Sequence, residues 1–264
     1  MNFLDKRKVI YYSDELNDEF STAEIKAKPI DENWIYCPKG LFKRFTRFFW
    51  YRIVATPIAF FATKIAFRHK IIGKEKLKPF RKNGYFIYGN HTHALGDAGM
   101  PSMITFPKSC YCVVHANNVS IPVLGRITPS LGALPLPDGM GAYKNFNAAI
   151  EQRIAEGNAV VIYPEAHIWP YYTKIRPFTG VSFAYPVKCD CPVFCFTNTY
   201  QKRKNGKKFR IVTYVEGPFF ADKGLSLRDR RLDLRNKVYN AMCENAKKSD
   251  FVCIEYIKRE EENG

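Results

Sequence analysis

Short apolar runs recur along the chain after residue 84, separated by polar or helical stretches. Several have the length and the β-branched or aromatic content of strands, and turn-forming residues follow most of them. These candidate strands are residues 85–88, 109–116, 132–136, 159–163, 192–199 and 209–215. The run at 159–163 is apolar at every position, as in strands that are buried on both faces of a sheet.

Two segments between and after these runs have helical character. Residues 142–156 are closed by Gly157, which is typical of a helix end. Near the C-terminus, apolar residues recur at the spacing of one helix face: Leu234, Val238, Ala241 and Met242. Strands that alternate with helices predict a single α/β domain, in which a central mixed sheet is flanked by helices.

The segment from Leu41 to Lys76 combines basic and apolar residues. Its uncharged run, residues 53–63, is 11 residues long, whereas about 20 are needed to span a bilayer. The segment has one acid, Glu75, and nine bases: Lys43, Arg44, Arg47, Arg52, Lys64, Arg68, Lys70, Lys74 and Lys76. This pattern favours a helix lying in the membrane interface over a buried helix with solvated ends. We therefore divide the chain into an N-terminal extension (1–40), a basic amphipathic membrane-interface helical segment (41–69) and the α/β domain (70–264).

The charge of the whole chain supports an anionic partner. Lys and Arg number 41 against 25 Asp and Glu, a formal net charge of +16. Anionic lipid and nucleic acid both fit this charge, and its clustering around an apolar segment favours lipid. Residues 1–40 contain no apolar core like that of a signal peptide, so we expect a peripheral or monotopic protein on the cytoplasmic face of the membrane. The eight cysteines are then reduced, and their C-x-C spacing does not predict a metal site.

Candidate chemistry is concentrated at residues 88–97, where the first apolar run ends. His91 and Asp97 lie a few residues apart after a strand, and strand ends are where α/β proteins usually place their sites. A carboxylate that accepts from one ring nitrogen leaves the other free to take a proton from a hydroxyl. The same residues allow two alternatives. A metal-dependent hydrolase could use His91, His93, Asp97 and His167 as ligands, and a nucleic-acid-binding protein would explain the charge and the aromatic residues.

Four sequence blocks in order resemble the glycerolipid, or lysophosphatidic acid-type, acyltransferase family. Asn90 and His91 with Asp97 resemble its first block, and residues 119–126, an apolar-Pro-x-x-Gly element, its second. Residues 161–166, with Pro164-Glu165 after an apolar strand, resemble its third, and residues 178–180 the stretch that follows. The resemblance covers about residues 70–217, and residues 70–264 are then an acyltransferase domain.

The resemblance implies an O-acyltransferase of phospholipid synthesis. It would move a fatty acyl group from acyl-CoA or acyl-carrier protein to a lysophospholipid-like hydroxyl, with no cofactor. His91 would be the base, with His93 as the alternative, and Asp97 its orienting partner. Oxyanion donors would lie near Gly125 or at the start of the following helix. The substrate-binding residues implied are Asn90, His93, Gly125, Arg126, Glu165 and Arg176.

This chain departs from the family pattern in three respects, one of which is that Pro137-Asp138-Gly139 stands where the second block often ends with an arginine. Five residues separate His91 from Asp97 where the family has four, so we expect a one-residue bulge at residues 94–96. The family's third block commonly continues to an arginine that holds an acceptor phosphate, but His167 and Ile168 follow Ala166 here. Arg126, Lys174 or Arg176 would have to replace that arginine, or the acceptor is uncharged.

Overall fold

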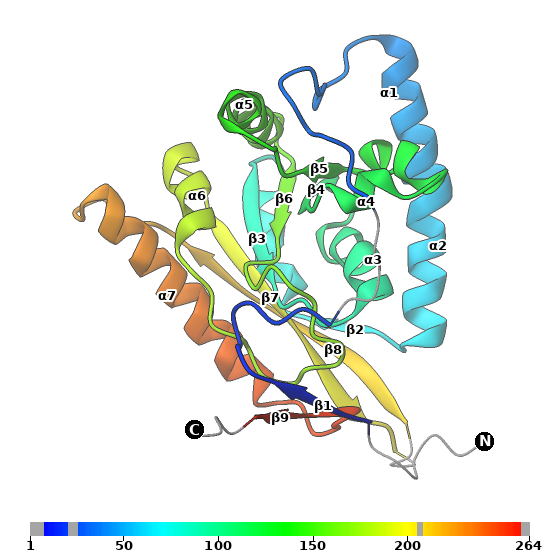
Figure 1. The fold of residues 1–264 in the computed structure, drawn as a ribbon, viewed down its shortest axis with the longest axis vertical. Coiled ribbons are helices and arrows are strands. Elements are labelled where there is room, and N and C mark those ends of the chain that lie inside the picture. The colour runs from blue at the N-terminus through cyan, green and yellow to red at the C-terminus, as the bar shows by residue number, and fades with distance from the viewer. Residues whose placement is uncertain (1–7, 21–25, 205–207, 260–264) are drawn as a thin grey trace.

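The computed structural model describes residues 8–20, 26–204 and 208–259, and a sheet runs through its centre (Figure 1). Its strand order is β2-β8-β7-β3-β6-β4-β5, and only the β7–β8 pair is antiparallel. The bounds are β2 Lys70–Ile72, β3 Tyr85–Gly89, β4 Cys110–Val114, β5 Ala133–Pro135, β6 Ala159–Ile162, β7 Val193–Lys202 and β8 Phe209–Phe219. The mixed sheet and every strand expected from the apolar runs are confirmed.

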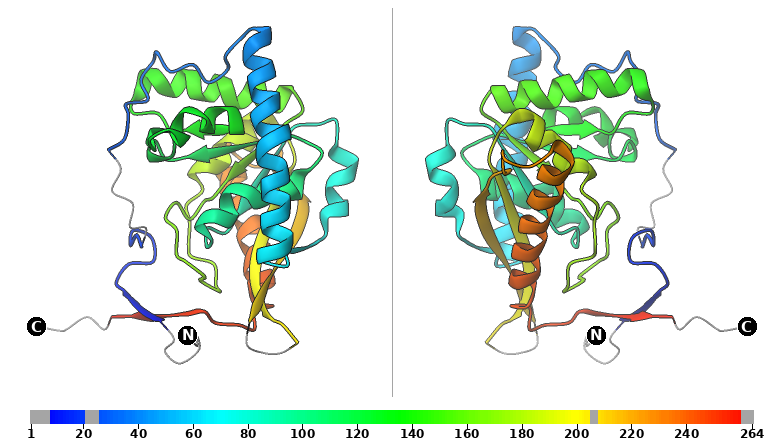
Figure 2. Two further views of the ribbon diagram at one scale, coloured as in Figure 1. Left: turned by 90° about the vertical axis from the view of Figure 1, so that its right-hand side faces the viewer. Right: turned by 90° about the vertical axis from the view of Figure 1, so that its left-hand side faces the viewer.

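Helices cover both faces of this sheet (Figure 2). One face packs against α5 (Met140–Ala155), α6 (Ala184–Cys189) and α7 (Leu227–Ala246), and the other against α3 (Ala94–Thr105) and part of the helix of residues 41–66. Strand β3 explains how the layers share the core, because Phe86 and Tyr88 enter the first layer and Tyr85 and Ile87 the second.

The basic segment forms one long helical element along one side of the molecule (Figure 1). It comprises α1 (Leu41–Phe48), π-helical turns at residues 49–55, α2 (Thr56–Phe61) and further π-helical turns to residue 66. Many of its apolar side chains are exposed, among them Leu41, Phe42, Phe45, Ile53, Ile58, Phe61 and Ile65. Within the described residues, no helix combines the length and the apolar character needed to cross a membrane.

The N-terminal extension is more structured than its sequence indicates. Strand β1 (Lys8–Tyr12) pairs in parallel with β9 (Ile254–Lys258), so the two ends of the chain form a small second sheet (Figure 1). Further along, the buried Ile30 exchanges backbone and side-chain hydrogen bonds with Asp138. The extension therefore packs against the α/β domain at two separate places.

Candidate active site

The carboxyl end of β3 brings a histidine against an aspartate. His91 follows β3, Asp97 lies in the first turn of α3, and Nδ1 of His91 is 2.8 Å from Oδ2 of Asp97. The Asp97 side chain is buried, whereas that of His91 is 25% exposed. An ionised carboxylate can only accept a hydrogen bond, so Nδ1 donates and Nε2 keeps its lone pair. His91 can therefore accept a proton on its exposed side.

A capping turn, and not a bulge, bridges the longer spacing between the two residues. The α-helix begins at Ala94, and its N-cap is His93, whose Nδ1 accepts from the Gly96 N–H at 2.9 Å. Oδ2 of Asp97 accepts from the His93 N–H at 2.9 Å as well as from His91. A Cβ at Gly96 would lie 2.9 Å from the capping nitrogen, so glycine leaves room for the ring. The expected bulge is wrong. The helix is regular from Ala94, and the turn before it brings His91 and His93 into contact with the first turn of the helix.

His93 has a structural environment that differs from the substrate contact we expected. Its side chain is buried and packs edge-on against Phe67 and Tyr171. Burial lowers the pKa of His93, against the opposing effect of Asp97. Its Nδ1 already caps the helix, and its Nε2 has no hydrogen-bond partner among the described residues. Protonating Nδ1 would remove the cap, which makes His93 a poorer base than His91.

A chain of buried polar groups, which was not predicted from the sequence, stands behind Asp97. Asn198 Nδ2 donates to Asp97 Oδ1 at 3.4 Å, and Asn198 Oδ1 accepts from the Thr213 hydroxyl at 2.6 Å. His69 Nε2 lies 2.7 Å from the same hydroxyl oxygen. Thr213 has already given its one proton to Asn198, so it accepts from His69. Every donor in this chain points toward the carboxylate, which holds the charged form of Asp97 in place.

The buried His69 predicts a loss of stability in acid. Burial first, and the charge of Lys64 second, lower the pKa of His69 to about 4. His69 therefore binds a proton near pH 6.5 in the unfolded chain but only near pH 4 in the folded chain. The free energy of unfolding decreases as the pH falls between these two values. We expect about 2 kcal/mol lost by about pH 5 from this residue. Urea unfolding of the wild type and His69→Gln, which keeps a donor to Thr213, should show a flatter pH dependence in the variant. Parallel curves would contradict the prediction.

Asn90 joins two strands at the same edge of the sheet. Its side-chain amide donates to the Asn198 carbonyl at 3.0 Å, and its Oδ1 accepts from the Asn198 N–H at 2.7 Å. Asn90 is 1% exposed. Its amide group is thus occupied in holding β3 to β7, which differs from the substrate contact expected for it.

Glu165 and Arg176 form a buried pair on the other side of His91. Glu165 follows β6 and accepts from the backbone N–H groups of His91 and Arg176, each at 3.0 Å. The Arg176 guanidinium donates to the carbonyls of Glu15, Glu165 and His167 and stacks on Trp169. Burial raises the pKa of Glu165, and Arg176 opposes the shift.

The location of this pair differs from the substrate contact expected for Glu165 and Arg176. Both side chains have zero exposed area, so neither carries a free charge to the open side of the site. The pair holds the loop after β6 against the backbone of His91. A brace of this kind fixes the position of the histidine without meeting a ligand.

The second sequence block lies in a turn whose backbone donors are already used. Gly125 and Arg126 belong to the 3-10 turn Leu124–Arg126, and the Gly125 N–H donates to the Ile121 carbonyl at 2.7 Å. The expected oxyanion donor near Gly125 is therefore engaged in this structure. Arg126 is exposed, and its guanidinium has no hydrogen-bond partner in the described part of the chain, so it differs from the buried Arg176.

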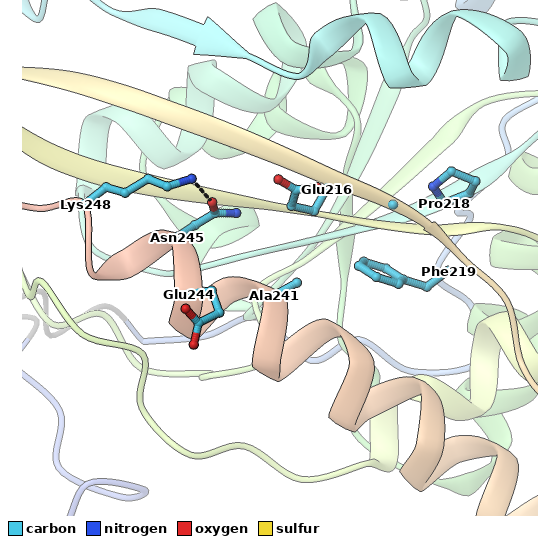
Figure 3. A pocket seen from close by; sticks show the side chains of 8 residues that line it. Glu216, Pro218, Phe219, Ala241, Glu244, Asn245 and Lys248 are labelled. Atoms are coloured by element: carbon cyan, nitrogen blue, oxygen red, sulfur yellow. Dashed lines mark hydrogen bonds between the residues drawn. The ribbon is translucent and has the colours of Figure 1, made fainter.

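Two further observations concern possible metal and ligand sites. Within residues 8–20, 26–204 and 208–259 there is no group of three or more His, Cys, Asp or Glu side chains placed to hold a metal ion. A hollow of about 450 Å³ lies between β8 and α7 (Figure 3), lined by Glu216, Phe219 and Asn245 among others. None of its lining residues belongs to the His91 site, so that hollow is separate from it.

Comparison with known proteins agrees with the fold and the order of the blocks. The family model described as Acyltransferase matches residues 68–197. The structure is similar to the crystal structure of the 1-acyl-sn-glycerophosphate (LPA) acyltransferase PlsC from Thermotoga maritima. The TM-score is 0.52 at 19% identity, over 78% of this chain and 87% of that one. A search of curated proteins gives no significant match. Residues 68–197 are an acyltransferase domain, of the family that the four sequence blocks predicted.

Proposed function

We propose that this acyltransferase moves a fatty acyl group from acyl-CoA or acyl-carrier protein to the hydroxyl of a lysophospholipid-like lipid, in phospholipid synthesis. The observation that carries the proposal is the 2.8 Å contact between His91 Nδ1 and Asp97, in a His91 side chain that is 25% exposed. The family match supplies the reaction class. The lipid acceptor follows from the motifs and from the fold shared with an LPA acyltransferase.

The proposed reaction needs no nucleophile from the protein. His91 Nε2 takes the proton of the acceptor hydroxyl as its oxygen attacks the thioester carbonyl carbon. The tetrahedral oxyanion collapses, the carbon–sulfur bond breaks, and the protonated imidazole returns the proton to the thiolate that leaves. Asp97 holds the ring and stabilises its positive charge between these steps. The products are an ester and a free thiol, and the enzyme regains its starting state.

We further propose that the reaction takes place at an anionic membrane surface, on its cytoplasmic face. Exposed aromatic and aliphatic side chains line the helix of residues 41–66, with Lys43, Arg44 and Lys64 among them. Apolar side chains that enter the interface and bases that meet phosphates are the usual pairing for peripheral binding. Arg126 is the exposed cation of the second block, and we propose it as the contact for an acceptor phosphate.

An acceptor panel tests the proposed reaction on the wild type. Purified protein on vesicles containing anionic lipid is given long-chain acyl-CoA, and thiol release is followed with lysophosphatidic acid, other lysophospholipids, monoacylglycerol or no acceptor. We expect release that depends on the acceptor, and the acylated lipid should appear by mass spectrometry in equal amount. If CoA fails, acyl-carrier protein thioesters are tested in the same way. No acceptor-dependent release from either donor would contradict the proposal.

A further inference from the structure

A basic cavity lies at the end of the sheet opposite the His91 site. Its volume is about 610 Å³, and its walls come from the helix of residues 41–66, the end of α5 and the residues that begin β4. Ser109 and Tyr111 lie at the amino end of β4, and Asn158 directly precedes β6. His91 and Glu165 follow the carboxyl ends of β3 and β6, so the cavity and the candidate active site are a strand length apart.

Positive charge in this cavity exceeds what the protein itself neutralises. Its charged lining consists of Lys39, Arg44, Arg47, Arg52, Arg153 and a single acid, Glu156. Glu156 is bound to Arg153 at 2.9 Å, and Arg52 donates to the Pro107 carbonyl at 2.6 Å. The remaining cations have no carboxylate among the residues that line the cavity. An anion of outside origin would balance them.

Two of these guanidinium groups are fixed in place and carry unused donors. The Arg47 and Arg153 guanidinium carbons lie 4.0 and 4.5 Å from the centre of the Tyr111 ring. Nη2 of Arg47 and Nε of Arg153 are buried without a hydrogen-bond partner in the described residues. Buried donors are nearly always satisfied in folded proteins, by the chain, by water or by a ligand. Rigid guanidinium groups of this kind match the oxygens of phosphate.

The cavity also adjoins an apolar surface. Phe48 lines it and is 56% exposed, and Leu41, Phe42 and Phe45 are exposed on the same end of the helix. A ligand whose phosphate enters the cavity would carry its other end along these side chains. This favours a phosphate attached to a hydrocarbon chain over a free phosphate ion.

We propose that this cavity binds the headgroup phosphate of an anionic membrane phospholipid, at a site separate from the acyl-transfer centre. The bound lipid would fix the start of the helix of residues 41–66 against the bilayer. The proposed site rests on the membrane binding proposed above. In addition to the general attraction between the basic helix and anionic lipids, it assigns one lipid phosphate to a defined cavity. It makes no use of His91 or of acyl transfer.

Vesicle binding separates the site from general charge attraction. Partition coefficients are measured by co-sedimentation with phosphatidylcholine vesicles that contain phosphatidylglycerol. Lys43→Gln removes one charge from the same helix without touching the cavity, and we expect about a fivefold loss. Arg47→Gln removes a donor inside the cavity, and we expect a loss of about 10- to 100-fold. Equal losses in the two variants would overturn the site, and no binding by the wild type would contradict the membrane proposal itself.

Cysteine labelling of the wild-type protein tests the same site without relying on the folding of the Arg47 variant. Cys37 lines the cavity as a free thiol, and Cys189 is a free thiol of α6 outside it. Peptide mass spectrometry follows their alkylation by a neutral maleimide. We expect vesicles with phosphatidylglycerol to slow the labelling of Cys37 at least about tenfold relative to vesicles of phosphatidylcholine alone, and to leave Cys189 unchanged. Protection of Cys37 by glycerol 3-phosphate but not by vesicles would overturn the lipid assignment in favour of a soluble phosphate.

Discussion

Replacing His91 with alanine is expected to lower the turnover number for acyl transfer by about 10²- to 10⁴-fold, the usual contribution of a positioned general base. The side chain supplies the exposed Nε2 that accepts the hydroxyl proton in the proposed reaction. His93 is buried with its Nδ1 committed to the helix N-cap, so it is badly placed to replace His91. The measurement is the acceptor-dependent rate of thiol release at saturating acyl-CoA.

Two controls distinguish loss of the base from loss of the fold or of the surface. His115→Ala removes an exposed histidine from outside the site, and its rate should remain within about twofold of the wild type. Vesicle partitioning of His91→Ala should also equal that of the wild type, because the helix of residues 41–66 is unchanged. If His91→Ala keeps more than about a tenth of the rate, the base is another group and the assignment is wrong.

The sequence predicted β3, β6 and β7 well because their apolar runs are buried on both faces. The sequence did not predict β1 or β9, in which exposed and half-buried positions are mixed. β1 and β9 each have exposed positions along their length, and they are stabilised by pairing with one another across the whole chain. β8 continues to Phe219 through Gly217 and Pro218, which normally end a strand. An irregularity in the pairing between Val193 and Cys195 accommodates this part of β8.

Residues of the site were predictable to the extent that they are neighbours in sequence. His91 and Asp97 are joined by one capping turn, so the seven residues from 91 to 97 contain both partners of the hydrogen bond and the turn that brings them together. Asn198, Thr213 and His69 reach Asp97 only because β7 lies beside β3 and β8 beside β7, an order that single-strand patterns do not contain. The signal that was available is the polar stretch at residues 197–199, which directly follows the apolar run of residues 193–196 in a buried part of the strand.

The N-terminal extension bears on the site through the brace of Glu165 and Arg176. The Glu15 carbonyl accepts from Arg176 at 3.1 Å, and the Asp18 carbonyl accepts from the Trp169 ring N–H at 2.8 Å. These contacts stabilise the loop after β6, which in turn holds the His91 backbone. A segment with little sequence signal thus helps to fix the candidate base, and this dependence could be seen only in three dimensions.

Replacing Asp97 with asparagine is expected to lower the turnover number by about 10²- to 10³-fold while leaving the acceptor KM nearly unchanged. The amide oxygen can still accept from the His93 N–H, so the start of α3 should be preserved, but the amide NH2 cannot accept from Asn198 as Oδ1 does. What the variant loses is the negative charge that stabilises protonated His91. Asn198→Ala keeps that charge and removes its 3.4 Å donor, together with the acceptor of the Thr213 hydroxyl, and we expect about a tenfold loss. If the negative charge of Asp97 matters more than the hydrogen bond from Asn198, the turnover number of Asn198→Ala should be higher than that of Asp97→Asn. Equal rates for Asp97→Asn and the wild type would show that the 2.8 Å pair has no part in proton transfer.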